Sequence, residues 1–134
     1  EDFPRQNFYH WVLADIPVNI NEIAEGKGKN YNMTETPEGS GKNYNNGVAL
    51  INDFASFIKD KSAQTFIGYD GPCPPWNDER LHHYHFIVYA LDTELGLAKV
   101  GRDWSFLGRD TIEDIEKHAI AKGELVGTYS NFVK

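Results

Sequence analysis

The sequence is poor in cysteine, since Cys73 is the only one among its 134 residues. A lone cysteine cannot form a disulfide within the chain, so cysteine usage does not indicate an oxidising or a reducing compartment. The sequence also lacks the grouped cysteines of a structural zinc framework. No disulfide scaffold and no resident cofactor are therefore expected.

Basic residues are in the minority, with 13 lysines and arginines against 20 aspartates and glutamates and a formal net charge of −7. Proteins that bind nucleic acid or an anionic bilayer present basic patches, and no basic cluster is visible here. Long apolar runs are missing too, because a stretch such as "WVLA" is far shorter than the roughly 20 residues that cross a bilayer. The sequence predicts a soluble single domain over residues 1–134 that does not bind nucleic acid.

An initiator methionine and a signal peptide are also absent at the N-terminus, where "EDFPRQNFYHW" reads as the middle of a longer sequence. We therefore expect that residues precede Glu1. A cytoplasmic location is the expectation, with the periplasm as the alternative.

Local patterns predict a chain dominated by strands. Alternating, aromatic and β-branched residues predict strands at 8–17, 82–91 and 124–133. Between Asn19 and Gly47 the composition turns to Gly, Asn, Lys and Thr, which predicts a long surface loop, and residues 48–58 are expected to be irregular. A capping pattern with Asp110 as N-cap and Gly123 as C-cap predicts one helix.

A stiff loop precedes the strand at 82–91. In "GPCPP" the prolines fix three φ angles and leave backbone N–H groups only on Gly71 and Cys73, beside Pro72. Such a loop can hold those donors in a fixed direction and so form an anion-binding concavity, and it is also a place where a cis X–Pro bond is expected. The alternative reading is a stiff corner between two elements.

Histidines and a tyrosine follow this loop in "HHYH". On a strand, His82 and Tyr84 share one face, and each can donate a hydrogen bond to an oxyanion. His10, expected on the face of the first strand with Phe8, Val12 and Ala14, would complete a pocket around a small phosphate-like group. A structural role for a single strand histidine is the alternative.

Two other readings of these residues remain open. His83 and His85 have the H-x-H spacing with which a strand can chelate zinc, although no third ligand is linked to them by spacing. Cys73 is alternatively a nucleophile with His82 as its base, which would make the protein a hydrolase.

Four segments in order, "FYHWVLADIP", "GYDGPCPPWND", "LHHYHFIVYALD" and "ELVGTYS", resemble the phosphatidylethanolamine-binding protein family, specifically its bacterial Raf kinase inhibitor-like branch. The resemblance runs from about Phe8 to Tyr129. It implies an antiparallel β-sandwich with a few peripheral helices and a small anion pocket at one end. The family's pocket residues fall on His10, on the loop from Gly71 to Pro75, and on His82 and Tyr84.

One departure concerns the family's acidic Asp-Pro-Asp-x-Pro loop, which no segment matches completely. Asp2 in "EDFP" is a candidate for its second aspartate, but we expect the acidic loop, together with further strands, to lie upstream of Glu1. A sheet built from these residues alone would then have an exposed edge that needs a cover or a partner, such as a second copy in a homodimer.

The function expected from these observations is a non-catalytic module that binds a phosphate-like or carboxylate anion, as found on a phospholipid head group, a nucleotide or a phosphopeptide. A hydrolase that uses Cys73 or a histidine-activated water is the alternative. A third reading is a protein inhibitor of a kinase or protease that docks its partner through the loop from Asn19 to Gly47.

Overall fold

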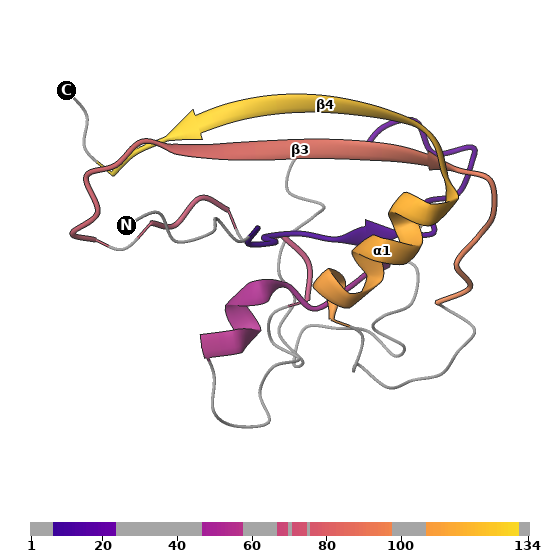
Figure 1. The fold of residues 1–134 in the computed structure, drawn as a ribbon, viewed down its shortest axis with the longest axis horizontal. Helices are drawn as coiled ribbons and strands as arrows, with labels where there is room; N and C mark the ends of the chain where they lie inside the picture. Colours follow the sequence, from indigo (N-terminus) through magenta and orange to yellow (C-terminus); the bar gives the residue numbers. More distant parts are fainter. Residues whose placement is uncertain are drawn as a thin grey trace. The chain divides into compact units, whose positions relative to one another are not determined.

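The computed structural model describes residues 7–23, 47–57, 67–69, 71–74, 76–97 and 107–131. The elements follow in the order β1 (Leu13–Ala14), β2 (Val48–Ala49), the 3-10 helix η1 (Asp53–Phe57), β3 (His82–Leu91), α1 (Gly108–His118) and β4 (Ala119–Tyr129) (Figure 1). The chain divides into two compact units, which we describe separately: Glu1–Asp70 with Gly96–Thr111, and Gly71–Leu95 with Ile112–Lys134. This part of the chain is mainly β, with antiparallel sheets and one α-helix.

The first unit is organised around the segment that contains β2. β1 and β2 pair antiparallel, and Ile51 bridges to both Ile67 and Leu107. Ile51 is buried and packs in one cluster with Ala49, Ala55 and Ile67. Burying an isoleucine side chain contributes about 1.5–3 kcal/mol. The apolar residues of 48–51 therefore hold the unit together from its centre.

Two predictions for this unit need correction. The strand predicted at 8–17 is reduced to Leu13–Ala14, and residues 48–58, predicted to be irregular, contain β2 and η1. The aromatic run at 8–11 is not part of β1. The rings of Phe8 and His10 both contact Phe54, and the carbonyl of Tyr9 accepts a hydrogen bond from the backbone N–H of Asp53. Of the loop predicted between Asn19 and Gly47, residues 24–46 lie outside the described part of the chain.

The second unit is a long two-stranded ribbon. β3 and β4 run side by side in Figure 1, and they pair antiparallel from His82↔Tyr129 to Leu91↔Ala119, with a register shift after Ala90. The strand predicted at 82–91 is confirmed with the same bounds. At the other end of the ribbon, His118, the last residue of α1, contacts Asp92, which follows β3. The His118 carbonyl accepts a hydrogen bond from the N–H of Asp92, and the His118 ring pairs with the Asp92 carboxylate.

The helix prediction is wrong at both ends. α1 begins at Gly108 and ends at His118, and Gly123, expected as its C-cap, lies in β4 opposite Val88. Thr111 contributes to the first turn, where its hydroxyl donates to the carbonyl of Leu107. Pairing with β3 thus overrides the helical spacing of the apolar residues after His118.

The ribbon leaves many apolar side chains exposed. Val88, Ile120 and Leu125 are each about 70% exposed, and Phe86, Ile87, Val126 and Tyr129 are exposed as well. A two-stranded ribbon alone is marginally stable in water and is ordinarily covered on one face. Within the described ranges, no helix is both long and apolar enough to span a bilayer.

Candidate functional site

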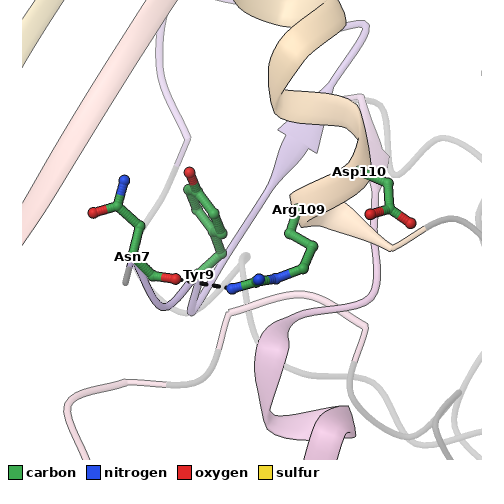
Figure 2. Close-up of a pocket in the computed structure, with 4 residues that line it drawn as sticks. All are labelled: Asn7, Tyr9, Arg109 and Asp110. Atoms are coloured by element: carbon green, nitrogen blue, oxygen red, sulfur yellow. Dashed lines mark hydrogen bonds between the residues drawn. The ribbon is translucent and has the colours of Figure 1, made fainter. Parts of the chain in front are cut away.

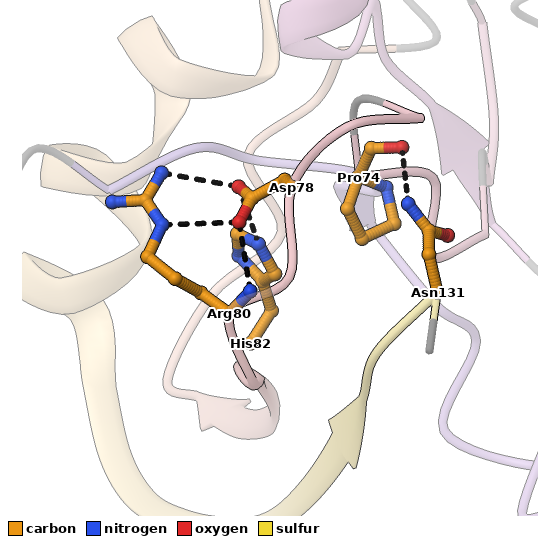
Figure 3. Close-up of polar contacts among 5 residues, drawn as sticks. All are labelled: Pro74, Asp78, Arg80, His82 and Asn131. Atoms are coloured by element: carbon orange, nitrogen blue, oxygen red, sulfur yellow. Dashed lines mark hydrogen bonds and ion pairs between the residues drawn. The ribbon is translucent and has the colours of Figure 1, made fainter. Parts of the chain in front are cut away.

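The candidate site lies at the end of the ribbon where β3 begins. His82 is the first residue of β3 and lies opposite Tyr129 near the end of β4. Two residues after Tyr129, the side-chain amide of Asn131 donates a 3.1 Å hydrogen bond to the carbonyl of Pro74 (Figure 3). This bond tethers the 71–74 loop to the chain just past the end of β4. The loop and His82 thus belong to the same end of the ribbon.

The 71–74 loop presents its middle to solvent. Pro72 and Cys73 are exposed, Gly71 is half-buried and Pro74 is buried. No cis peptide bond occurs in the described residues, so the cis prediction is wrong for the bonds that precede Pro72 and Pro74. Pro75 lies outside the described part of the chain. The carbonyl of Pro74 provides the observed anchor, and the role predicted for the N–H groups of Gly71 and Cys73 stays a prediction.

The first four side chains of β3 alternate in burial as the sequence predicts, and the alternation is lost from Phe86 to Val88, which are all exposed. His82 and Tyr84 are half-buried, whereas His83 and His85 on the other face are exposed. His85 pairs through Nδ1 with the carboxylate of Glu124 on β4. No group of three metal-ligating side chains is found among residues that the structure describes. His82 and Tyr84 therefore have the common orientation that an anion pocket would require.

Asp78 is a site residue that the sequence analysis missed. Its carboxylate accepts from Nε, Nη2 and the backbone N–H of Arg80, at 2.9–3.1 Å. It also lies 3.0 Å from Nε2 of His82 (Figure 3). The hydrogen bonds from Arg80 hold the pKa of Asp78 far below its usual range. The spacing D-x-R-x-H was the available signal, because residues two apart in an extended segment share a side.

His10 belongs to the first unit and lies in an aromatic cluster. Its ring meets Phe54 edge-on with centroids 4.9 Å apart and Phe8 with centroids 5.3 Å apart. Edge-on aromatic contacts of this kind contribute about 0.5–1.5 kcal/mol each, so the cluster gives His10 a structural role. His10 lies in the first unit and His82 in the second, and a pocket lined by both stays a prediction.

A second polar cluster in the first unit surrounds Arg109 at the start of α1. Arg109 binds Asp53 through two hydrogen bonds and donates a third, of 2.9 Å, to the carbonyl of Asn7. The Asp53 carboxylate raises the pKa of Arg109. Asn7, Tyr9, Arg109 and Asp110 line an open hollow of about 380 Å³ there (Figure 2). Because the guanidinium of Arg109 is already paired with Asp53, we assign the residues around this hollow a structural role.

Comparison with known proteins identifies relatives over nearly the whole chain. A family model described as phosphatidylethanolamine-binding protein matches residues 1–130. UPF0098 proteins of Pyrococcus horikoshii and Pyrococcus abyssi are 37% and 36% identical to it over 96% of its length. A UPF0098 protein of Methanothermobacter thermautotrophicus is 30% identical over the same share. The matches cover 52%, 58% and 66% of these relatives, so the chain spans between half and two thirds of their length. No solved structure matches the chain significantly.

Proposed function

Because the chain belongs to the phosphatidylethanolamine-binding protein family, we propose that it is a non-catalytic module that binds a phosphate-like or carboxylate anion. His82, Tyr84 and the 71–74 loop would form the site, with His10 as a further ligand. The observation that carries the proposal is the tether from Asn131 to Pro74, which keeps the loop at the end of the ribbon where His82 begins β3. An imidazolium and a phenol beside backbone N–H donors suit an anion with several acceptor oxygens.

The β-sandwich is part of the proposal. In a sandwich two sheets pack their apolar faces against each other about 10 Å apart. The apolar side chains exposed on β3 and β4, Val88 and Leu125 among them, provide such a face. The anion would belong to a phospholipid head group, a nucleotide or a phosphopeptide. We also propose that a partner protein or a second copy of the chain binds at the exposed edge of the sheet. The proposed location is the cytoplasm.

One observation favours a second candidate. The pairing of Asp78 with His82 has the form in which a carboxylate orients a catalytic histidine, and Cys73 lies exposed on the tethered loop. A cysteine hydrolase would need the Cys73 thiolate at neutral pH. Alkylation of Cys73 by iodoacetamide distinguishes the two, since the binding module predicts a rate that rises only toward alkaline pH. Rapid alkylation at neutral pH that is abolished in His82→Gln would favour the hydrolase.

The proposed function is tested by titrating the isotope-labelled protein with inorganic phosphate at mildly acidic pH and recording amide and histidine-ring NMR signals. Sodium chloride at equal ionic strength is the control. The proposal predicts saturable shifts at His82, Tyr84 and the 71–74 loop and none at His83. Shifts confined to other residues, or the same shifts with chloride, would contradict it.

A further inference from the structure

The contact between Asp78 and His82 fixes which nitrogen of the imidazole is available to a ligand. We propose that Asp78 holds the hydrogen of His82 on Nε2, so that His82 offers Nδ1 to an anion only when the ring carries a second proton. The first half of this inference concerns the protein alone. The second half rests on the proposed function, because it makes anion binding at His82 a proton-linked event.

The argument begins with Asp78, whose side chain is only 9% exposed. Arg80 donates three hydrogen bonds to it, at 2.9, 3.0 and 3.1 Å, one from the backbone and two from the guanidinium. These donors favour the ionised carboxylate and keep the pKa of Asp78 far below its usual range. An ionised carboxylate has no hydrogen to donate, so in the 3.0 Å contact with His82 the hydrogen belongs to Nε2.

The state of the other nitrogen follows from this. A neutral imidazole carries one N–H, and with that hydrogen on Nε2 the Nδ1 atom is a lone-pair acceptor. An anion oxygen facing Nδ1 would then meet a lone pair and be repelled. Protonation converts Nδ1 into a donor and gives the ring a positive charge, so the same contact becomes attractive. Removal of the Asp78 carboxylate would let the neutral ring shift its hydrogen to Nδ1 and donate without a charge.

In the described part of this unit, four residues near His82 besides Asp78 bear on its charge. Arg80 contacts Asp78 from the same loop, Tyr129 lies opposite on β4, and Tyr84 follows on the same face of β3. Cys73 lies on the loop that Asn131 tethers at this end. Histidine is the side chain that ordinarily changes charge between about pH 5 and 8. The pH dependence of an anion contact here is therefore assigned to the ring of His82.

Two other histidines provide an internal contrast. His85, on the opposite face of β3, uses Nδ1 to contact Glu124, and His118 uses Nδ1 to contact Asp92. Their acidic partners favour the hydrogen on Nδ1, the reverse of His82. One molecule thus offers both arrangements under the same solution conditions.

Nitrogen-15 NMR of the ring nitrogens tests the first half without any ligand. In the neutral form, His82 should show a protonated Nε2 and a bare Nδ1, with the opposite pattern at His85 and His118. Asp78→Asn should shift the signals of His82 toward a mixture of the two tautomers, because a carboxamide both donates and accepts. The matched control Glu124→Gln should change His85 and leave His82 as it is. A hydrogen on Nδ1 of His82 in the wild-type protein overturns the proposal, and this result needs no variant to fold.

Titration with inorganic sulfate, which takes up no proton in the neutral range, tests the second half. Affinity should fall about tenfold per pH unit once His82 becomes neutral, and the fall should be shallower in Asp78→Asn. If sulfate binds with an affinity that does not change across this pH range, the proton linkage is wrong, although the anion site itself is not contradicted. Failure of wild-type protein to bind either sulfate or phosphate at any pH contradicts the proposed function itself, whatever tautomer the ring nitrogens report.

Discussion

Asp53 holds Arg109 in a two-point contact, with Nε 3.0 Å from Oδ1 and Nη2 2.9 Å from Oδ2. The same carboxylate also accepts a hydrogen bond of 2.8 Å from the backbone N–H of Tyr9. The side chain of Asp53 is only 8% exposed. It therefore connects η1, the start of α1 and the segment that precedes β1. Removal of this one carboxylate would take away three hydrogen bonds that link these parts of the first unit.

The first prediction concerns this carboxylate. Asp53→Ala should lower the free energy of unfolding by about 2–4 kcal/mol, because the guanidinium and the Tyr9 N–H lose a charged acceptor. Urea unfolding measures the effect as a lower midpoint with an unchanged slope. Asp110→Ala is the matched control, since Asp110 is exposed on the adjacent turn. Equal midpoints for the two variants would show that the contact contributes little.

The second prediction concerns close approach at two glycines. A Cβ on Gly108 would lie 2.6 Å from Cγ2 and 2.8 Å from Cβ of Val12, and a Cβ on Gly47 would lie 2.7 Å from the carbonyl oxygen of Ala14. Gly47 also has a positive φ of 126°. Alanine at either position should destabilise the protein by about 1–3 kcal/mol. Gly123→Ala should change stability little, because no atom lies within 4 Å of its added Cβ. Thermal unfolding of the three variants measures this, and the midpoints of Gly47→Ala and Gly108→Ala should lie below that of Gly123→Ala.

A pH-dependent stability is the third prediction, and its sign follows from Asp78. The pKa of this carboxyl is lowered in the folded protein by the hydrogen bonds from Arg80. The ionised group therefore stabilises the fold above the unfolded pKa of about 3.9, and that stabilisation is lost as pH falls toward the lower folded value. Asp78→Asn should reduce stability near neutral pH but make it fall less steeply on acidification. Urea midpoints at about pH 7 and about pH 3 measure this, with Asp114→Asn as control. Parallel acid profiles for wild type and Asp78→Asn would contradict it.

The fourth prediction concerns the tether of the loop. Asn131→Ala removes the donor to Pro74 and should raise the amide exchange rates of Gly71 and Cys73. Phosphate affinity should then fall severalfold, because the loop donors are no longer held in place before binding. Asn19→Ala, at an exposed position outside this unit, is the control. Unchanged phosphate affinity together with faster exchange would separate the loop from the anion site.

The sequence predicted those features that depend on local pattern. The strand at His82–Leu91 was found with its bounds because aromatic and β-branched residues alternate there, and the alternation also placed His82 and Tyr84 on one side. Strand β4 was partly mistaken for helix because Ala119 and Ile120 continue the apolar stripe of α1. The partner strand β3 decides their state, and no local pattern contains that information.

Other features depended on contacts that sequence alone does not give. The run at 8–11 has strand composition, yet its rings pack against Phe54, a residue far along the chain. The prolines of the 71–74 loop indicated stiffness, whereas its anchor comes from Asn131. Asp78 was within reach of sequence reasoning, since its spacing to Arg80 and His82 is visible.

The most direct test of the anion site is calorimetric titration with phosphate of wild type, His82→Gln and His83→Gln at mildly acidic pH. The two variants remove adjacent imidazoles from opposite faces of β3, so a general effect of lost charge would appear in both. The account predicts saturable binding of phosphate to wild type and an unchanged dissociation constant for His83→Gln. For His82→Gln it predicts a dissociation constant at least about tenfold higher, as expected from loss of a charge-assisted hydrogen bond. Equal dissociation constants for all three proteins would contradict a role for His82 in anion binding.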